Sequence, residues 1–241
     1  MATTVTQPPP QPPATSSPAE PPATRDDLLI RHVHAKISKL QATYLDGSPT
    51  AAGSLAKLRR AVNASPGSDP GVWFETLDDV PPALIGAGDA ASSYEQAIHA
   101  SITLYAIHQQ SQRGRMYQRD YPLGRSVRLL AKRVSTETMK NDNPVLRRFH
   151  ALGTASSLPE TLHHLRGLIT QLRAEAIALD YSQLAEDLRR LQHQRTAPGV
   201  RLQWGRDYHR IKADPSATPA GDSNPGVPPS TDHDSSIGDP A

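Results

Sequence analysis

Arginine is the residue type whose number and spacing in this chain could do chemistry. Twenty of the 26 basic residues are Arg, and a guanidinium offers five N–H donors in a planar fork that matches a phosphate group. Residues 113–133 hold seven basic residues and one acidic residue, and further arginines follow up to Arg210. Some arginines are expected to serve only solubility, but their clustering predicts a surface that binds the backbone of a polyanion.

The histidines do not form a pattern that predicts a metal site. His32 and His34 are two residues apart, so their side chains point in different directions on a helix, and no HExxH motif accompanies them. We expect His99 and His108 to find hydrogen-bond partners beside a core helix. The sequence therefore predicts no metal and no cofactor.

The residues needed for acid–base or nucleophilic catalysis do not come together in the sequence either. Glu186 and Arg190 stand four residues apart with Asp187 beside them, which is typical of a solvated charged face on a helix. The chain has no Cys and no GxSxG turn to carry a nucleophile. We expect no catalytic residues and no enzymatic activity.

The elements that must position the arginines lie between two unusual ends. Residues 1–24 and 213–241 contain 14 of the 23 prolines, six acidic residues and no Lys or Arg, a composition typical of disordered tails. Residues 25–212 contain all 26 basic residues and the other 18 of the 24 acidic ones, a formal net charge of +8. Residues 113–212 alone have 19 basic and 9 acidic residues, a net charge of +10.

The chain has no apolar run long enough to span a bilayer, which takes roughly 18 residues, and its start does not resemble a signal peptide. We therefore expect a cytoplasmic protein without membrane contact.

Between the two ends, apolar residues recur at helical spacing. Thr24 and Asp27 form a capping-box pattern at the start of a first helix, and Asp89 is predicted to cap a central, most buried helix. Trp73, Phe74 and Leu77 are predicted to begin a short helical turn that plugs the core. The sequence therefore predicts an all-α fold, a compact bundle of about eight helices.

Basic and apolar side chains separate cleanly near the middle of the chain. Leu123, Val127, Leu130 and Val134 share one face at about 100° per residue. Arg125, Arg128 and Lys132 share the opposite face. This segment is predicted to be an amphipathic helix that directs its cations away from the core.

The last element before the C-terminal end allows two interpretations. Val200, Trp204, Tyr208 and Ile211 are spaced as on one face of a helix, which is the favoured interpretation. A strand through Val200, Leu202 and Trp204 stays open, because periodicity does not settle short runs.

Six segments, taken in order, carry a resemblance to a known family. They are SLAKLRRAV (54–62), AIHASITLYAIHQQS (97–111), YPLGRSVRLLAKR (121–133), VLRRFHALGTASSLPETLHHLRGLI (145–169), LDYSQLAEDLRRLQ (179–192) and VRLQWGRDYHR (200–210). Their content and order resemble the CasB family, the small subunit of the type I-E CRISPR surveillance complex called Cascade. The LG-Arg turn and the closing WGR are the most specific parts, and the two ends of the chain take no part in the resemblance.

The resemblance implies a two-lobed helical protein, with an N-terminal lobe over 25–135 and a basic C-terminal lobe over 136–212. It also implies a non-catalytic subunit that steadies the guide–target heteroduplex and the displaced strand of the R-loop through sequence-independent backbone contacts. The implied partners are guide RNA, both strands of the target DNA, the CasC-type backbone, the large subunit and a second copy of the chain.

Particular basic residues follow from the resemblance and from their position on the helices. The family pattern falls on Arg59, Arg60, Arg125, Arg147, Arg148, Arg166 and Arg206. Helical-wheel position and charge add Arg128, Lys132, Arg201 and Arg210. We expect the cationic groups of these residues, nearly all of them guanidinium groups, to converge into one continuous basic track.

Two other functions stay open at this point. A helix-turn-helix regulator would place one Arg-bearing helix in the major groove and bind a palindrome. A structural adaptor would bind protein subunits only, and its arginines would serve solubility.

Overall fold

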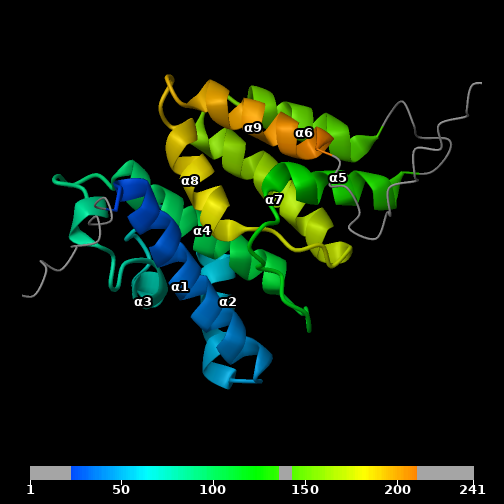
Figure 1. Cartoon of the computed structure of the whole chain (residues 1–241). Helices are drawn as coiled ribbons and strands as arrows, with labels where there is room; N and C mark the ends of the chain where they lie inside the picture. Colours follow the sequence, from blue (N-terminus) through cyan, green and yellow to red (C-terminus); the bar gives the residue numbers. More distant parts are fainter. Residues whose placement is uncertain (1–22, 136–142, 211–241) are drawn as a thin grey trace, which may run out of the picture. The chain divides into compact units, whose positions relative to one another are not determined.

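The computed structural model describes residues 23–135 and 143–210, and within these ranges the regular elements are all helical (Figure 1). This confirms the all-α class. The α-helices are α1 (Arg25–Leu45), α2 (Pro49–Arg60), α3 (Trp73–Thr76), α4 (Ser93–Gln109), α5 (Leu123–Val134), α6 (Pro144–Thr154), α7 (Leu158–Ala174), α8 (Tyr181–Leu191) and α9 (Ala197–His209). Three short 3₁₀ turns are η1 (Ala61–Asn63), η2 (Pro70–Val72) and η3 (Pro82–Leu84). None of the described helices is long and apolar enough to cross a membrane.

The predicted disordered tails, 1–24 and 213–241, lie almost entirely outside the described residues, as do residues 136–142 at the predicted boundary between the two lobes. The division into lobes at residue 135 therefore stays a prediction. The described parts of both predicted lobes belong to one compact unit, because α4 of the first packs against α7 and α8 of the second.

Helix α4 forms the centre of the core, as its apolar stripe predicts. It packs against α1, α2, α7 and α8 (Figure 1), and most of its side chains are buried. Ser92, and not Asp89, caps it: the Ser92 hydroxyl accepts from the Glu95 amide at 3.1 Å, and the Glu95 carboxylate accepts from the Ser92 amide at 2.8 Å. Ser92 directly precedes the first residue of α4, and this is the position from which a side chain reaches the free amides of the first turn.

Each of the two core histidines has one hydrogen-bond partner, as expected, while His99 Nδ1 and His108 Nε2 have none among the described residues. His99 Nε2 lies 3.1 Å from the Ala61 carbonyl oxygen, and His108 Nδ1 lies 2.9 Å from the Tyr181 hydroxyl. Burial lowers the pKa of His108 to about 3, so its ring is neutral at physiological pH. Both rings act as uncharged parts of the core.

A side-chain amide anchors the Arg-rich loop that follows α4. Gln41 on α1 accepts from the Tyr117 amide at 2.8 Å and donates to the Tyr117 carbonyl at 3.1 Å. On the other side of the loop, the Leu179 amide donates to the Met116 carbonyl at 3.0 Å. The loop thus connects α1 to the segment between α7 and α8, and Tyr117 becomes buried.

Helices α5 and α9 approach each other closely at Gly124, the glycine of the LG-Arg turn. A Cβ at this position would lie 2.7 Å from the Tyr208 amide nitrogen and would also collide with the Trp204 carbonyl oxygen. Both are backbone atoms of α9, which cannot rotate away as a side chain can. Only glycine allows the two backbones to meet at this distance.

The prediction that Trp73 and Phe74 plug the core is wrong. Trp73 is 47% exposed and Phe74 69% exposed. The inward positions belong to Val72, the N-cap of the short helix α3, and to Thr76, four residues further on, so the two aromatic rings point outward. The Trp73 indole is held at the surface, where it donates to the Gly67 carbonyl at 2.9 Å.

The last element is the helix α9, and the strand alternative is wrong. Asp187 also differs from prediction: it is buried on α8, where its carboxylate accepts from the Trp204 indole of α9 at 2.6 Å and from the Gln183 amide at 3.4 Å. Burial raises the pKa of Asp187 to about 7, although both hydrogen bonds lower it. The carboxylate therefore joins α8 to α9 inside the core.

We predict that Gly124→Ala destabilises the protein by about 1–3 kcal/mol or more, because α9 must move away from α5. The matched control is Gly53→Ala on α2, where a Cβ would have no atom within 4 Å. That variant should gain up to about 1 kcal/mol in helix propensity. Urea denaturation of the two variants measures both changes, and equal stabilities would contradict the close approach.

We predict that the Asp187 carboxylate makes stability fall as pH rises from about 4 to about 7. Because its folded-state pKa lies near 7, above the ordinary value of 3.8, the folded protein retains a proton that the unfolded chain has already released. Asp187→Asn keeps an acceptor for the Trp204 indole but cannot titrate. The free energy of unfolding of wild type minus variant should decrease between pH 4 and pH 7, and a constant difference would contradict the assignment.

Candidate nucleic-acid interface

The basic residues of α5 are ordered by carbonyl oxygens. Arg125 donates to the Asp120 carbonyl at 2.6 Å and its guanidinium lies 4.1 Å from the centre of the Tyr121 ring. Arg128 donates to the Arg210 carbonyl at 2.7 Å, at the end of α9. Lys132 is exposed one turn further on. We call Arg125, Arg128, Lys132, Arg206 and Arg210 the α5–α9 group.

A second set of basic residues lies where α2 ends beside α7. Arg166 of α7 donates to the Asn63 side-chain oxygen at 2.5 Å, which ties α7 to the turn η1 after α2. Arg59 and Arg60 form the last turn of α2. Burial lowers the pKa of Arg59, and the charges of Arg173 and Arg60 lower it further, so these cations are neighbours. We call Arg59, Arg60, Arg166 and Arg173 the α2–α7 group.

The remaining predicted residues lie on α6 and on the first half of α9. Arg147 and Arg148 are exposed on α6. The Arg148 guanidinium lies over Gly167 of α7, where a Cβ would come within 3.0 Å of it. Arg201 of α9 donates to the Ala155 carbonyl at 2.8 Å. Most of the predicted cations therefore lie on the four helices α5, α6, α7 and α9.

Three of these arginines, Arg125, Arg128 and Arg166, have neutral partners, whereas Arg210 lies 3.7 Å from the Asp207 carboxylate. Other arginines in the protein also pair with carboxylates. Arg189 forms an ion pair with Asp26, and Arg190 lies 3.3 Å from the Glu186 carboxylate. Arg125, Arg128 and Arg166 donate instead to carbonyl or amide oxygens. A neutral oxygen fixes a guanidinium in place without cancelling its charge. Such groups are ordered in advance and keep the charge that attracts an anion.

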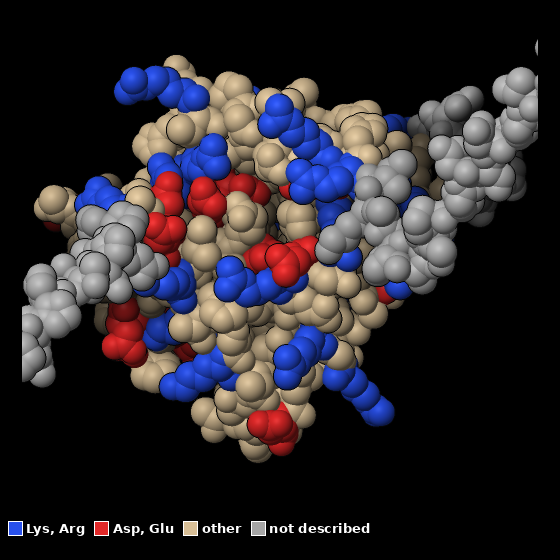
Figure 2. Space-filling view, in the orientation of Figure 1, with Lys and Arg blue, Asp and Glu red and all other residues tan. Residues whose placement is uncertain are grey.

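The predicted single basic track does not appear on the face shown in Figure 2. On the described part of this face, Lys and Arg stand in separate groups, with Asp and Glu between them. The contacts above tie Arg128 to the end of α9 and Arg166 to the turn after α2, and Arg147, Arg148 and Arg201 belong to neither the α5–α9 nor the α2–α7 group. Whether the eleven predicted residues contact nucleic acid stays a prediction.

Two further arginines belong with these groups and were missed in the sequence. Arg173 donates to the Gln110 side-chain oxygen at 2.7 Å, and Arg133 donates to the Glu175 carbonyl. A signal for Arg173 was present, because it stands seven residues after Arg166 and so shares its helical face. Arg133 stands in the basic run 113–133, but its partner at the end of α7 is distant in the chain and no spacing indicates it.

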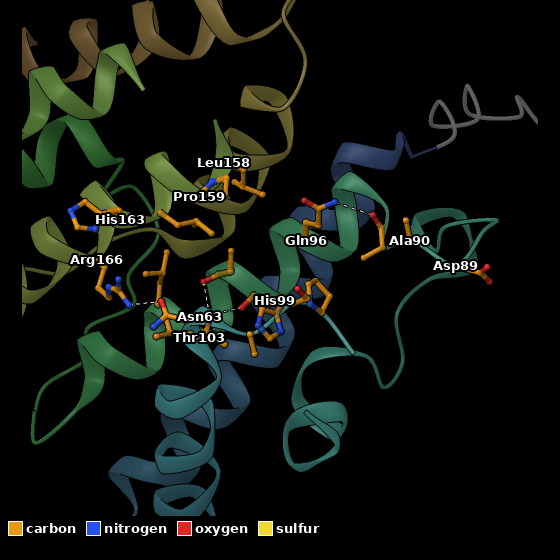
Figure 3. A pocket seen from close by; sticks show the side chains of 18 residues that line it. Asn63, Asp89, Ala90, Gln96, His99, Thr103, Leu158, Pro159, His163 and Arg166 are labelled. Carbon is orange, nitrogen blue, oxygen red and sulfur yellow. Dashed lines mark hydrogen bonds between the residues drawn. The ribbon is translucent and has the colours of Figure 1, made fainter. Parts of the chain in front are cut away.

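Arg166 also borders a pocket of about 610 Å³ between η1, α4 and α7 (Figure 3). Figure 3 shows Arg166 hydrogen-bonded to Asn63, with His163 of α7 beside it, Leu158 and Pro159 further along the same helix and Asp89 at a distance. The lining includes His99 and His163. Among the described residues, no group of three or more His, Cys, Asp or Glu could hold a metal ion.

The helical fold and the charge-retaining arginines define a basic all-α protein with a candidate surface for a polyanion. The family model for the CRISPR-associated protein Cse2 matches residues 54–209, more than half of the chain. The chain therefore belongs to the Cse2 family, also called CasB, and this confirms the resemblance in the sequence.

Solved structures agree with this assignment. CasB from Thermobifida fusca is 34% identical with a TM-score of 0.64, over 76% of this chain and 98% of that one. A Cse2-family protein from Thermus thermophilus is 21% identical with a TM-score of 0.53, over 75% and 96% of the two chains. A chain of a CRISPR RNA-guided surveillance complex is 23% identical with a TM-score of 0.57, over 75% and 93%. The last two show the shared fold, and a comparison with curated proteins finds no match.

Proposed function

We propose that this chain is a non-catalytic subunit of a CRISPR RNA-guided surveillance complex that binds nucleic-acid backbones without reading sequence. It contacts the guide–target heteroduplex and the displaced strand of the R-loop. Membership of the Cse2 family and the likeness to a chain of such a complex support the assignment to the complex. The other partners in this proposal are the remaining subunits of the complex and a second copy of the chain.

The observation that carries the nucleic-acid part is the neutral anchoring of Arg125, Arg128 and Arg166. Each guanidinium uses one donor on an oxygen of the protein and keeps its charge and its remaining donors for a phosphate. Neutralising phosphates releases bound counterions, which supplies affinity for any sequence. R-loop formation is a nearly balanced exchange of one duplex for another, so modest backbone contacts are enough to favour the open state.

We predict that Arg128→Gln and Arg166→Gln each weaken binding to single- and double-stranded DNA of any sequence. Each lost phosphate contact should reduce the slope of log K against log salt by roughly 0.7–0.9. The matched control is Arg190→Gln on α8, because the Arg190 charge is already paired with Glu186 at 3.3 Å. Fluorescence anisotropy at several salt concentrations measures both the affinity and the slope.

The possible outcomes separate the proposal from its alternatives. Unchanged affinity and slope in both variants would contradict the proposed contacts. A preference of about a thousandfold for one palindromic site would instead indicate a sequence-reading regulator. Assembly with protein subunits and no affinity for nucleic acid would indicate a structural adaptor.

A further inference from the structure

A groove of about 440 Å³ runs between α6 and α9, away from the pocket that Arg166 borders. Figure 1 shows these two helices next to each other. The buried Trp204 ring lines the groove from α9, held by its hydrogen bond to Asp187. The groove therefore has a rigid apolar wall within a strongly basic part of the chain.

Two glycines keep the groove open. Gly153 of α6 and Gly205 of α9 both line it, and a Cβ on either would meet no atom within 4 Å. Glycine within a helix costs up to about 1 kcal/mol relative to alanine. Packing does not require glycine at either position, in contrast to Gly124. The space beside these two glycines is therefore left free by the packing and is open to a ligand.

Aromatic rings line the groove beside the glycines. Phe149 of α6 and Tyr208 of α9 lie with their ring centres 5.7 Å apart and their planes 30° from parallel. Both rings are only partly buried although they pack against the core. Partly exposed ring faces next to an open space are the groups on which a nucleobase stacks.

The charge around the groove favours an anionic ligand. Arg201, His150 and His209 line it, and the described residues of its lining include no Asp or Glu. Arg128 of the α5–α9 group is close enough to Tyr208 for its charge to lower the pKa of the phenol, although burial raises that pKa overall. A strand bound along the α5–α9 group therefore passes beside the rings of the groove.

We infer that the α6–α9 groove binds an unpaired base of a single-stranded nucleic acid. The base stacks on Tyr208 and Phe149 in the space left by Gly153 and Gly205, while the adjoining phosphates meet Arg128 and Arg206. This inference rests on the proposed function and adds a base contact to it. The contact is tolerant of sequence, because every base has a flat π-face and the stacking groups here are rings.

The experiment uses the full chain and two oligonucleotides of equal length, oligo-dT and an abasic strand with the same number of phosphates. Backbone contacts are the same for both, so a difference in affinity reports the bases. We expect wild type to bind oligo-dT roughly tenfold more tightly, within the range known for stacking of one base. Gly205→Leu should fill the groove and abolish this preference while leaving affinity for the abasic strand unchanged.

Two variants control for indirect effects. Gly53→Leu on α2 also adds a side chain at an open helical glycine, but away from the groove, and should keep the preference. Tyr208→Leu removes the ring and should lose the preference. Circular dichroism melting of each variant establishes that its helical fold is intact at the assay temperature.

The outcomes distinguish this inference from the proposed function. If wild type bound both oligonucleotides with equal affinity and the same dependence on salt, the base site would be overturned and the proposed function would stand. Failure to bind either strand would overturn both. A Gly205→Leu variant that keeps its base preference but no longer joins protein subunits would assign the groove to a protein side chain and would also overturn the inference.

Discussion

The close packing of α5 against α9 is the constraint on which the rest of the site depends. Because Gly124 brings the two backbones together, the Arg128 side chain reaches the carbonyl of Arg210 at 2.7 Å. The same contact fixes α9, so that Trp204 meets Asp187 of α8 and Tyr208 meets Phe149 of α6. Cations and rings from separate helices are thereby held in one place without a metal cluster or a disulfide among the described residues.

The arginines show how a protein can prepare a surface for phosphates. A mobile arginine side chain loses conformational entropy when it binds a phosphate. A carboxylate partner would order the side chain beforehand, but it would also neutralise its positive charge. Carbonyl and amide oxygens order Arg125, Arg128 and Arg166 and leave the charge in place. This arrangement reduces the entropic cost of binding and suits contacts that must work on any sequence.

Local features of the fold could be predicted and long-range ones could not. The capping box of Thr24 and Asp27 forms as its spacing indicates, with the Asp27 amide 3.1 Å from the Thr24 hydroxyl. The burial of Asp187 depends on Trp204 of the next helix, and no periodicity within α8 reveals that partner. The open groove likewise arises only when α6 and α9 meet. Arginine clustering predicted which segments carry charge, but not which oxygens of the fold hold each guanidinium, such as the Arg210 carbonyl for Arg128.

The Gln41 side chain makes the same pair of hydrogen bonds to the Tyr117 backbone that a neighbouring β-strand would make. Its oxygen accepts from the Tyr117 amide, and its nitrogen donates to the Tyr117 carbonyl. The Tyr117 amide hydrogen is consequently shielded from solvent for as long as α1 remains docked. Its rate of exchange with deuterium reports how often the N-terminal helix detaches. A shorter amide at position 41 would leave that hydrogen unprotected even in an otherwise intact molecule.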